Sequence, residues 1–78
     1  MPVTKEDVLT VIAETKAVEN VSRLRDDMKL SDQGIDSLEL FNVLLLISEK
    51  YGIDIPDEDS ELLNTINEIV AYLNRKLA

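Results

Sequence analysis

The chain has 78 residues, with 16 acidic side chains, 8 basic ones and a formal net charge of −8 at pH 7. It contains neither cysteine nor histidine, which excludes disulfides, the two commonest zinc ligands and the usual nucleophile–base pairs of enzymes. Hydrophobic residues make up 45% of the sequence, enough for a core and too many for a disordered acidic tail. We therefore expect one small domain, residues 1–78, held together by aliphatic packing.

The acidity also restricts the partners of the chain. Lys and Arg drive nucleic-acid binding, and an acidic domain is repelled by nucleic acids and anionic membranes. Residues 1–7 are charged where a secretory signal would be apolar, and the longest apolar run, Val43–Ile47, is too short to span a bilayer. The sequence predicts a soluble, cytoplasmic monomer that neither binds nucleic acid nor inserts into membranes, and whose protein partners carry basic patches.

The first predicted helix runs from Thr4 to about Lys16. Thr4 and Asp7 have the spacing of an N-terminal cap, and apolar residues then recur at helical spacing: Val8, Leu9, Ile12 and Ala13. Residues 17–36 show no sustained period, so we expect a long connection there. Gly34, near its end, is expected to form a sharp turn with positive φ.

A second helix is predicted from Asp36 or Ser37 to about Tyr51, with Gly52 as its end. Asp36 and Glu39 have the spacing of a capping box, with Asp in place of the usual Ser or Thr. On a helical projection its core face and its opposite face are both apolar. The core face holds Leu40, Val43, Leu44, Ile47 and Tyr51, and the opposite face holds Leu38, Phe41 and Leu45. The second face indicates either burial on all sides or a docking surface for another protein.

The remaining residues predict two more helical segments. Pro56 disfavours helix at the residue before it, so residues 53–56 are expected to be extended, and residues 57–61 to start one short helical turn. The last helix begins near Thr65 and ends with Arg75 and Lys76. Its apolar stripe consists of Ile66, Ile69, Val70, Leu73 and Leu77. The fold class is therefore all-α: a small four-helix bundle with three longer helices, one short helix and a long loop between the first two.

Residues 34–40, Gly-Ile-Asp-Ser-Leu-Glu-Leu, resemble the attachment motif of acyl carrier proteins, whose core is Asp-Ser-Leu. Residues 51–57, Tyr-Gly-Ile-Asp-Ile-Pro-Asp, follow at the spacing of that family, and the resemblance covers nearly the whole chain. It implies that Ser37 carries 4′-phosphopantetheine through a phosphodiester and that an acyl group rides on the added thiol as a thioester. Independently, Ser37 begins a helix, where free N–H groups and the helix dipole favour an anionic phosphate.

The resemblance also implies transport rather than catalysis. A phosphopantetheinyl transferase would load the chain, which would then present acyl intermediates to enzymes of fatty acid, lipid or polyketide biosynthesis. An acyl chain could also retract between the helices, with Leu46 and the stripe of the last helix as candidates for lining that space. Docking to Lys and Arg of these enzymes is expected from acidic and apolar residues near the motif: Asp36, Leu38, Glu39, Phe41, Leu45, Glu49, Asp57 and Glu61.

The second helix departs from the pattern of typical fatty-acid carriers at two places. Asn42 stands where they have an acid on the exposed face, and residues 48–50, Ser-Glu-Lys, replace an acidic cluster. These departures indicate specialised partners, in a dedicated lipid, polyketide or aminoacyl (D-alanyl or peptidyl) pathway, or drift at tolerant positions. A second hypothesis is a non-carrier acidic module that binds a basic partner. Calcium binding by the acids of residues 54–61 is disfavoured because their spacing lacks the EF-hand pattern, so no metal is expected.

Overall fold

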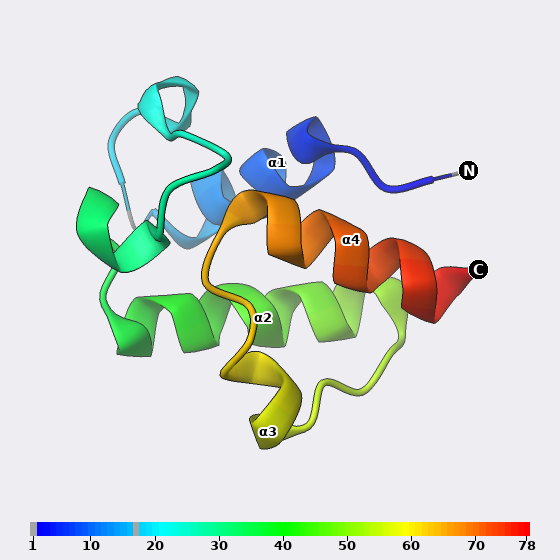
Figure 1. The fold of residues 1–78 in the computed structure, drawn as a ribbon. Helices are drawn as coiled ribbons and strands as arrows, with labels where there is room; N and C mark the ends of the chain where they lie inside the picture. The colour runs from blue at the N-terminus through cyan, green and yellow to red at the C-terminus, as the bar shows by residue number, and fades with distance from the viewer. Residues whose placement is uncertain (1, 17) are drawn as a thin grey trace.

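The computed structural model describes residues 2–16 and 18–78, and this part of the chain consists of helices and loops without a strand (Figure 1). Three longer helices are α1 (Lys5–Thr15), α2 (Ser37–Tyr51) and α4 (Ile66–Leu77), and α3 (Asp57–Ser60) is a single short turn. The predicted all-α class is confirmed. The connection between α1 and α2 also contains two 3₁₀ turns, η1 (Val21–Arg23) and η2 (Leu30–Gln33), which are too short to produce a visible period.

Each longer helix begins at a side-chain cap. Reciprocal capping boxes start α1 and α4, in the pairs Thr4–Asp7 and Thr65–Glu68. In α2 the bond runs one way: Asp36 Oδ1 accepts the N–H of Glu39 at 2.9 Å, whereas the sequence predicts the full capping box. The physical difference is charge, because a Thr cap is neutral whereas Asp36 and Glu39 are both carboxylates and repel each other.

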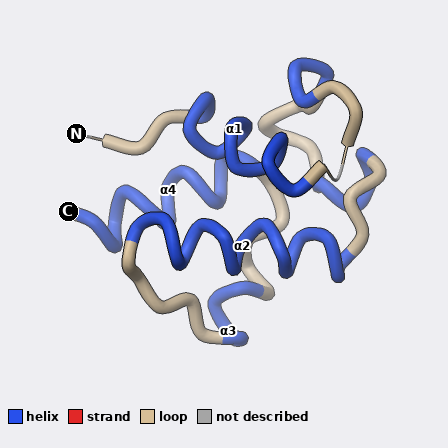
Figure 2. Tube along the Cα trace, turned by 180° about the vertical axis from the view of Figure 1, so that it is seen from behind, coloured by secondary structure: helices blue, strands red, loops and turns tan. Residues whose placement is uncertain are grey.

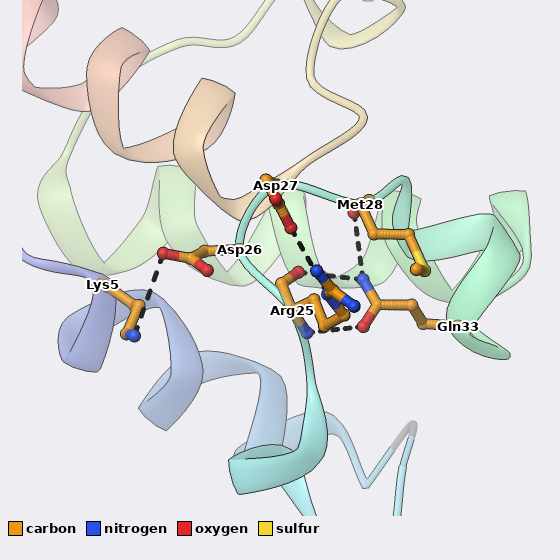
Figure 3. A network of polar contacts seen from close by, with 6 residues as sticks. All are labelled: Lys5, Arg25, Asp26, Asp27, Met28 and Gln33. Carbon is orange, nitrogen blue, oxygen red and sulfur yellow. Dashed lines mark hydrogen bonds and ion pairs between the residues drawn. The ribbon is translucent and has the colours of Figure 1, made fainter.

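The side chain of Gln33 holds the long connection in place (Figure 3). Its Oε1 accepts the N–H of Arg25 at 2.6 Å, and its Nε2 donates to the carbonyls of Arg25 at 2.9 Å and Met28 at 3.0 Å. Lys5 of α1 reaches the same segment, with Nζ 3.9 Å from Asp26 Oδ2. The loop is therefore tied to η2 and to α1, which fixes the residues directly upstream of α2.

One hydrophobic core lies where α1 packs against α2 and α4. Its fully buried residues come from these helices and from the segment that leads into α2: Val8, Val11, Ile12, Leu30, Ile35, Val43, Ile47, Ile66, Ile69 and Leu73. Leu77, predicted for the α4 stripe, is instead 42% exposed because the last turn of α4 extends past the end of α2 (Figure 1). Tyr72, which lies outside that stripe, is buried.

The two ends of the described chain lie on the same side of the molecule (Figure 2). Asn74 of α4 joins them: its Oδ1 accepts the N–H of Val3 at 2.7 Å, and its Nδ2 donates to the carbonyl of Val3 at 3.1 Å. Val3 is itself 5% exposed. The segment before α1 is thereby attached to the last helix.

The negative charge is poorly neutralised in the second half of the chain. Residues 37–74 contain eight acidic side chains and one basic one. The two ion pairs of the described structure, Lys5–Asp26 at 3.9 Å and Arg25–Asp27 at 3.6 Å, both lie outside this segment. Mutual repulsion of the unpaired carboxylates therefore acts against the folded state.

Sodium chloride is expected to raise the melting temperature of this protein, because salt screens repulsion between exposed charges. Thermal unfolding followed by circular dichroism at increasing sodium chloride measures the effect, and chloride is preferable to sulfate, which stabilises proteins by exclusion. As a control, Glu58→Lys reverses one exposed charge of α3 and should reduce the dependence on salt. A melting temperature that is independent of salt would contradict charge repulsion as a main destabilising effect.

Candidate functional site

Ser37 is exposed and occupies the first position of α2. The N–H groups of the first residues of a helix have no acceptor in a preceding turn, and Asp36 takes only that of Glu39. The N–H groups of Ser37 and Leu38 therefore lie at the N-terminal end of α2, beside the Ser37 side chain, where the helix dipole also favours an anion. The position is chemically suited to a phosphate ester that projects into solvent.

The residues before Ser37 fix its position. Leu30 and Ile35 are both fully buried, and the N–H of Ile35 donates to the carbonyl of Leu30 at 3.0 Å. Between them Gly34 ends η2 with φ 94°, as predicted, a conformation that a side chain would strain. Because Ile35 is held in the core, the chain emerges at Asp36 and presents Ser37 at the surface.

The second apolar face predicted for α2 is exposed. Leu38, Phe41 and Leu45 are 69%, 51% and 48% exposed, whereas the core face holds Val43 and Ile47 at 0%. The structure therefore excludes burial of α2 on all sides. A solvent-exposed apolar stripe begins directly after Ser37, and it is the kind of surface that marks protein contacts.

A groove runs between α2 and α3 from Ser37 toward the far end of α2. Its outer part, a cavity of about 220 Å³, is lined by Ser37, Leu40, Phe41, Leu44, Ser60, Glu61 and Asn64. Its inner part, about 150 Å³, is lined by Phe41, Leu44, Leu45, Ser48, Asp54, Ile55, Asp57 and Ser60. The two parts share Phe41, Leu44 and Ser60, so they lie next to each other along α2.

The predicted docking residues are divided between this groove and the open surface. Phe41, Leu45, Asp57 and Glu61 line the groove, and Leu38, Asp36 and Glu49 are exposed outside it, with Glu39 half-buried. The candidates for lining a space for the acyl chain lie outside this groove: Leu46 lines neither part, and Ile66, Ile69 and Leu73 of α4 are packed into the core. Helical periodicity does not predict that α3 and the residues on either side of it line the groove. That lining depends on where the chain returns beside α2.

The short helix α3 is attached to α4 by Tyr72, whose hydroxyl donates to Asp59 Oδ2 at 2.8 Å. Of its own four residues, none is buried. Burial, the hydrogen bond to Asp59 and the charges of Asp59 and Asp54 raise the pKa of Tyr72 from 10.0 to about 12, against a smaller lowering by Arg75. Because Asp57 and Ser60 of the same helix line the groove, Tyr72 helps to set the position of one groove wall.

Tyr72→Phe is expected to lower the free energy of unfolding by about 1–2 kcal/mol, because it removes a hydrogen bond to a carboxylate. The ring remains, including its contact with Lys76, whose Nζ lies 5.6 Å from the ring centroid. The contribution of Tyr72 should be fully present below pH 10 and lost as pH rises toward 12, because the unfolded state loses its proton first. Urea unfolding of both proteins at neutral pH and at about pH 11 tests this. If the parent protein and the variant differ in free energy of unfolding by the same amount at both pH values, the predicted loss of the Tyr72 contribution is contradicted.

Residues 2–16 and 18–78 contain neither a metal-binding cluster nor a membrane-spanning helix. In this part of the chain no group of three or more His, Cys, Asp or Glu residues is arranged to hold a metal ion. In the same residues no helix combines the length and the hydropathy needed to cross a membrane.

Residues 6–73 match the protein family described as the phosphopantetheine attachment site. The acyl carrier protein of Helicobacter pylori is 35% identical over 74 residues, which cover 94% of this chain and 95% of that protein. The meromycolate extension acyl carrier protein of Mycobacterium tuberculosis is 33% identical over 79 residues, covering 96% of this chain and 69% of the relative. A solution structure of a butyryl-acyl carrier protein, from the actinorhodin polyketide synthase of Streptomyces coelicolor, superposes with a TM-score of 0.83. It is 25% identical and covers 99% of this chain and 93% of that one.

Proposed function

Because the chain belongs to the acyl carrier protein family, whose prosthetic group is phosphopantetheine, we propose that its Ser37 is the attachment residue within a single carrier domain of residues 1–78. The observation that carries this proposal is the exposed position of Ser37 at the start of α2, inside the matched residues 6–73. The buried anchors Leu30 and Ile35 support it, because they hold the hydroxyl where a transferase can reach it.

When bound, 4′-phosphopantetheine supplies a thiol, absent from this cysteine-free chain, that holds an acyl group as a thioester. The Ser37 Oγ provides the phosphodiester link, and the N–H groups at the start of α2 favour its negative charge. The groove that starts at Ser37 offers the acyl group a partly apolar surface along Leu40, Phe41 and Leu44. The chain thus carries and shelters a cargo and performs no reaction of its own.

The docking surface proposed for partner enzymes is the exposed face of α2 with the acids around it. Leu38, Phe41 and Leu45 provide the apolar contact, and the acids attract Lys and Arg of the partner: Asp36, Glu39, Glu49, Asp57 and Glu61. The partners are a phosphopantetheinyl transferase and acyl-processing enzymes of fatty acid, lipid or polyketide biosynthesis. An aminoacyl cargo is the alternative within the family. A cytoplasmic location and a monomeric state stay predictions from the sequence.

Loading by a phosphopantetheinyl transferase tests the proposed function. The purified chain is incubated with the transferase and coenzyme A, and its intact mass is recorded. We expect a gain of one phosphopantetheine and no second addition. A chain whose mass stays unchanged with a transferase that loads another acyl carrier protein would support the non-carrier hypothesis instead.

A further inference from the structure

The inner part of the groove between α2 and α3 has polar side chains on both walls, and these polar groups are acceptors. The Ser48 hydroxyl donates to the carbonyl of Leu45 at 2.7 Å, and the Ser60 hydroxyl donates to that of Asp57 at 2.7 Å. Each hydroxyl has a single proton, so each retains only lone pairs for a further contact. The hydroxyls on both walls therefore offer acceptors to a group that enters the groove.

Two carboxylates add to this lining. Asp54 follows α2 and Asp57 begins α3, both are exposed, and neither takes part in the ion pairs of the described structure. Carboxylates accept hydrogen bonds and do not donate them. Within the described residues, the side-chain lining of the inner groove thus contains four groups with free acceptors, and the rest of that lining is apolar: Phe41, Leu44, Leu45 and Ile55.

We propose that this groove favours short acyl groups that carry a hydrogen-bond donor, an amino or hydroxyl group, and disfavours acyl groups that end in a carboxylate. The inference rests on the proposed attachment at Ser37, which places the base of the phosphopantetheine arm at the outer end of the groove. An amino group gains both hydrogen bonds and attraction to Asp54 and Asp57, a hydroxyl gains hydrogen bonds alone, and a second carboxylate is repelled. An unsubstituted acyl group leaves all four acceptors without a donor from the cargo.

The size of the inner groove limits the length of the cargo. A cavity of about 150 Å³ is comparable with one that accommodates benzene, so it holds about six carbon atoms. From Ser37 to Ser48 the groove follows α2 for roughly 16 Å, the rise of 11 helical residues. The arm of a short acyl group would therefore lie along the outer part, lined by Leu40, Phe41 and Leu44, and the inner part would receive the acyl group itself. A longer chain would extend back into the outer part.

Four acyl groups with a four-carbon chain test the proposal: butyryl, 3-hydroxybutyryl, 3-aminobutyryl and succinyl. Each is attached from its coenzyme A thioester by a phosphopantetheinyl transferase, the mass is checked, and the melting temperature is measured. We expect the 3-hydroxybutyryl form of the protein to have a melting temperature about 2–5 °C above that of the butyryl form. The 3-aminobutyryl form should melt at a still higher temperature, and the succinyl form at a lower temperature than the butyryl form. The comparison of hydroxybutyryl with butyryl involves no change in charge, so it isolates the hydrogen bonds.

A matched pair of variants separates the effect of a carboxylate in the groove from the effect of the net charge of the protein. Asp57→Asn and Glu58→Gln each remove one carboxylate from neighbouring positions of α3, but only Asp57 lines the groove. The difference in melting temperature between the 3-aminobutyryl and succinyl forms should shrink in D57N and persist in E58Q. Equal shrinkage in both variants, or equal melting of the hydroxybutyryl and butyryl forms, would overturn the inference. If none of the four acyl groups attaches, that result would instead overturn the proposed function.

Discussion

Ser37→Ala is expected to abolish loading by a phosphopantetheinyl transferase completely, because the phosphodiester has no other oxygen from which to form at the start of α2. The side chain is exposed and is not the helix cap, so the free energy of unfolding should change by no more than about 0.5 kcal/mol. Intact mass spectrometry after incubation with coenzyme A measures loading, and urea unfolding verifies that the variant is folded.

Ser31→Ala is the matched control for this substitution. Ser31 is an exposed serine in η2, upstream of Ser37, and its variant should load as the parent chain does. Mass gain that persists in S37A would contradict the assignment of the attachment residue. Loss of loading in S31A with loading retained in S37A would move the site to η2.

Leu73→Ala is expected to cost about 2–5 kcal/mol of the free energy of unfolding, because it removes a fully buried side chain and leaves a cavity. A domain of this size has a total stability of roughly 4–12 kcal/mol, so much of it would be lost. Urea unfolding followed by circular dichroism gives the difference, and the slope with urea shows whether the variant still unfolds in one step.

Leu77→Ala provides the comparison within α4. The two leucines are one helical turn apart, but Leu77 is 42% exposed and Leu73 is 0% exposed. We expect L77A to cost less than about 1 kcal/mol. A cost for L77A equal to that for L73A would show that the last turn of α4 is packed in solution, as the apolar stripe of the sequence predicts.

The sequence could predict those parts of the fold that depend on local signals. Thr4, Asp36 and Thr65 mark the starts of the three longer helices, and Gly52 ends α2 in a left-handed conformation at φ 64°. Such caps act within one turn of the chain, so residue types and spacing are sufficient to find them. The proposal that Ser37 is the attachment residue also starts from a contiguous motif, the resemblance of residues 34–40 to that of acyl carrier proteins.

The groove and its supports could not be predicted because they depend on contacts between distant segments. Tyr72 meets Asp59 only because α3 returns beside α4, and Gln33 bonds the backbone of Arg25 only because the loop folds on itself. Leu46, a candidate for lining a space for the acyl chain, does not line the groove. Its angle on α2 leaves it half-buried, but the groove forms on the side where α3 lies, against Phe41, Leu44 and Leu45.

Peptide mass spectrometry of the protein purified from its native host tests the central claim most directly. Trypsin cleavage after Lys29 and Lys50 releases residues 30–50, which contain Ser31, Ser37 and Ser48. Fragmentation of this peptide is expected to place one phosphopantetheine on Ser37, and the mass on its thiol identifies the cargo. A peptide that carries the group on Ser31 or Ser48, or that is unmodified in every preparation from the host, would contradict the account.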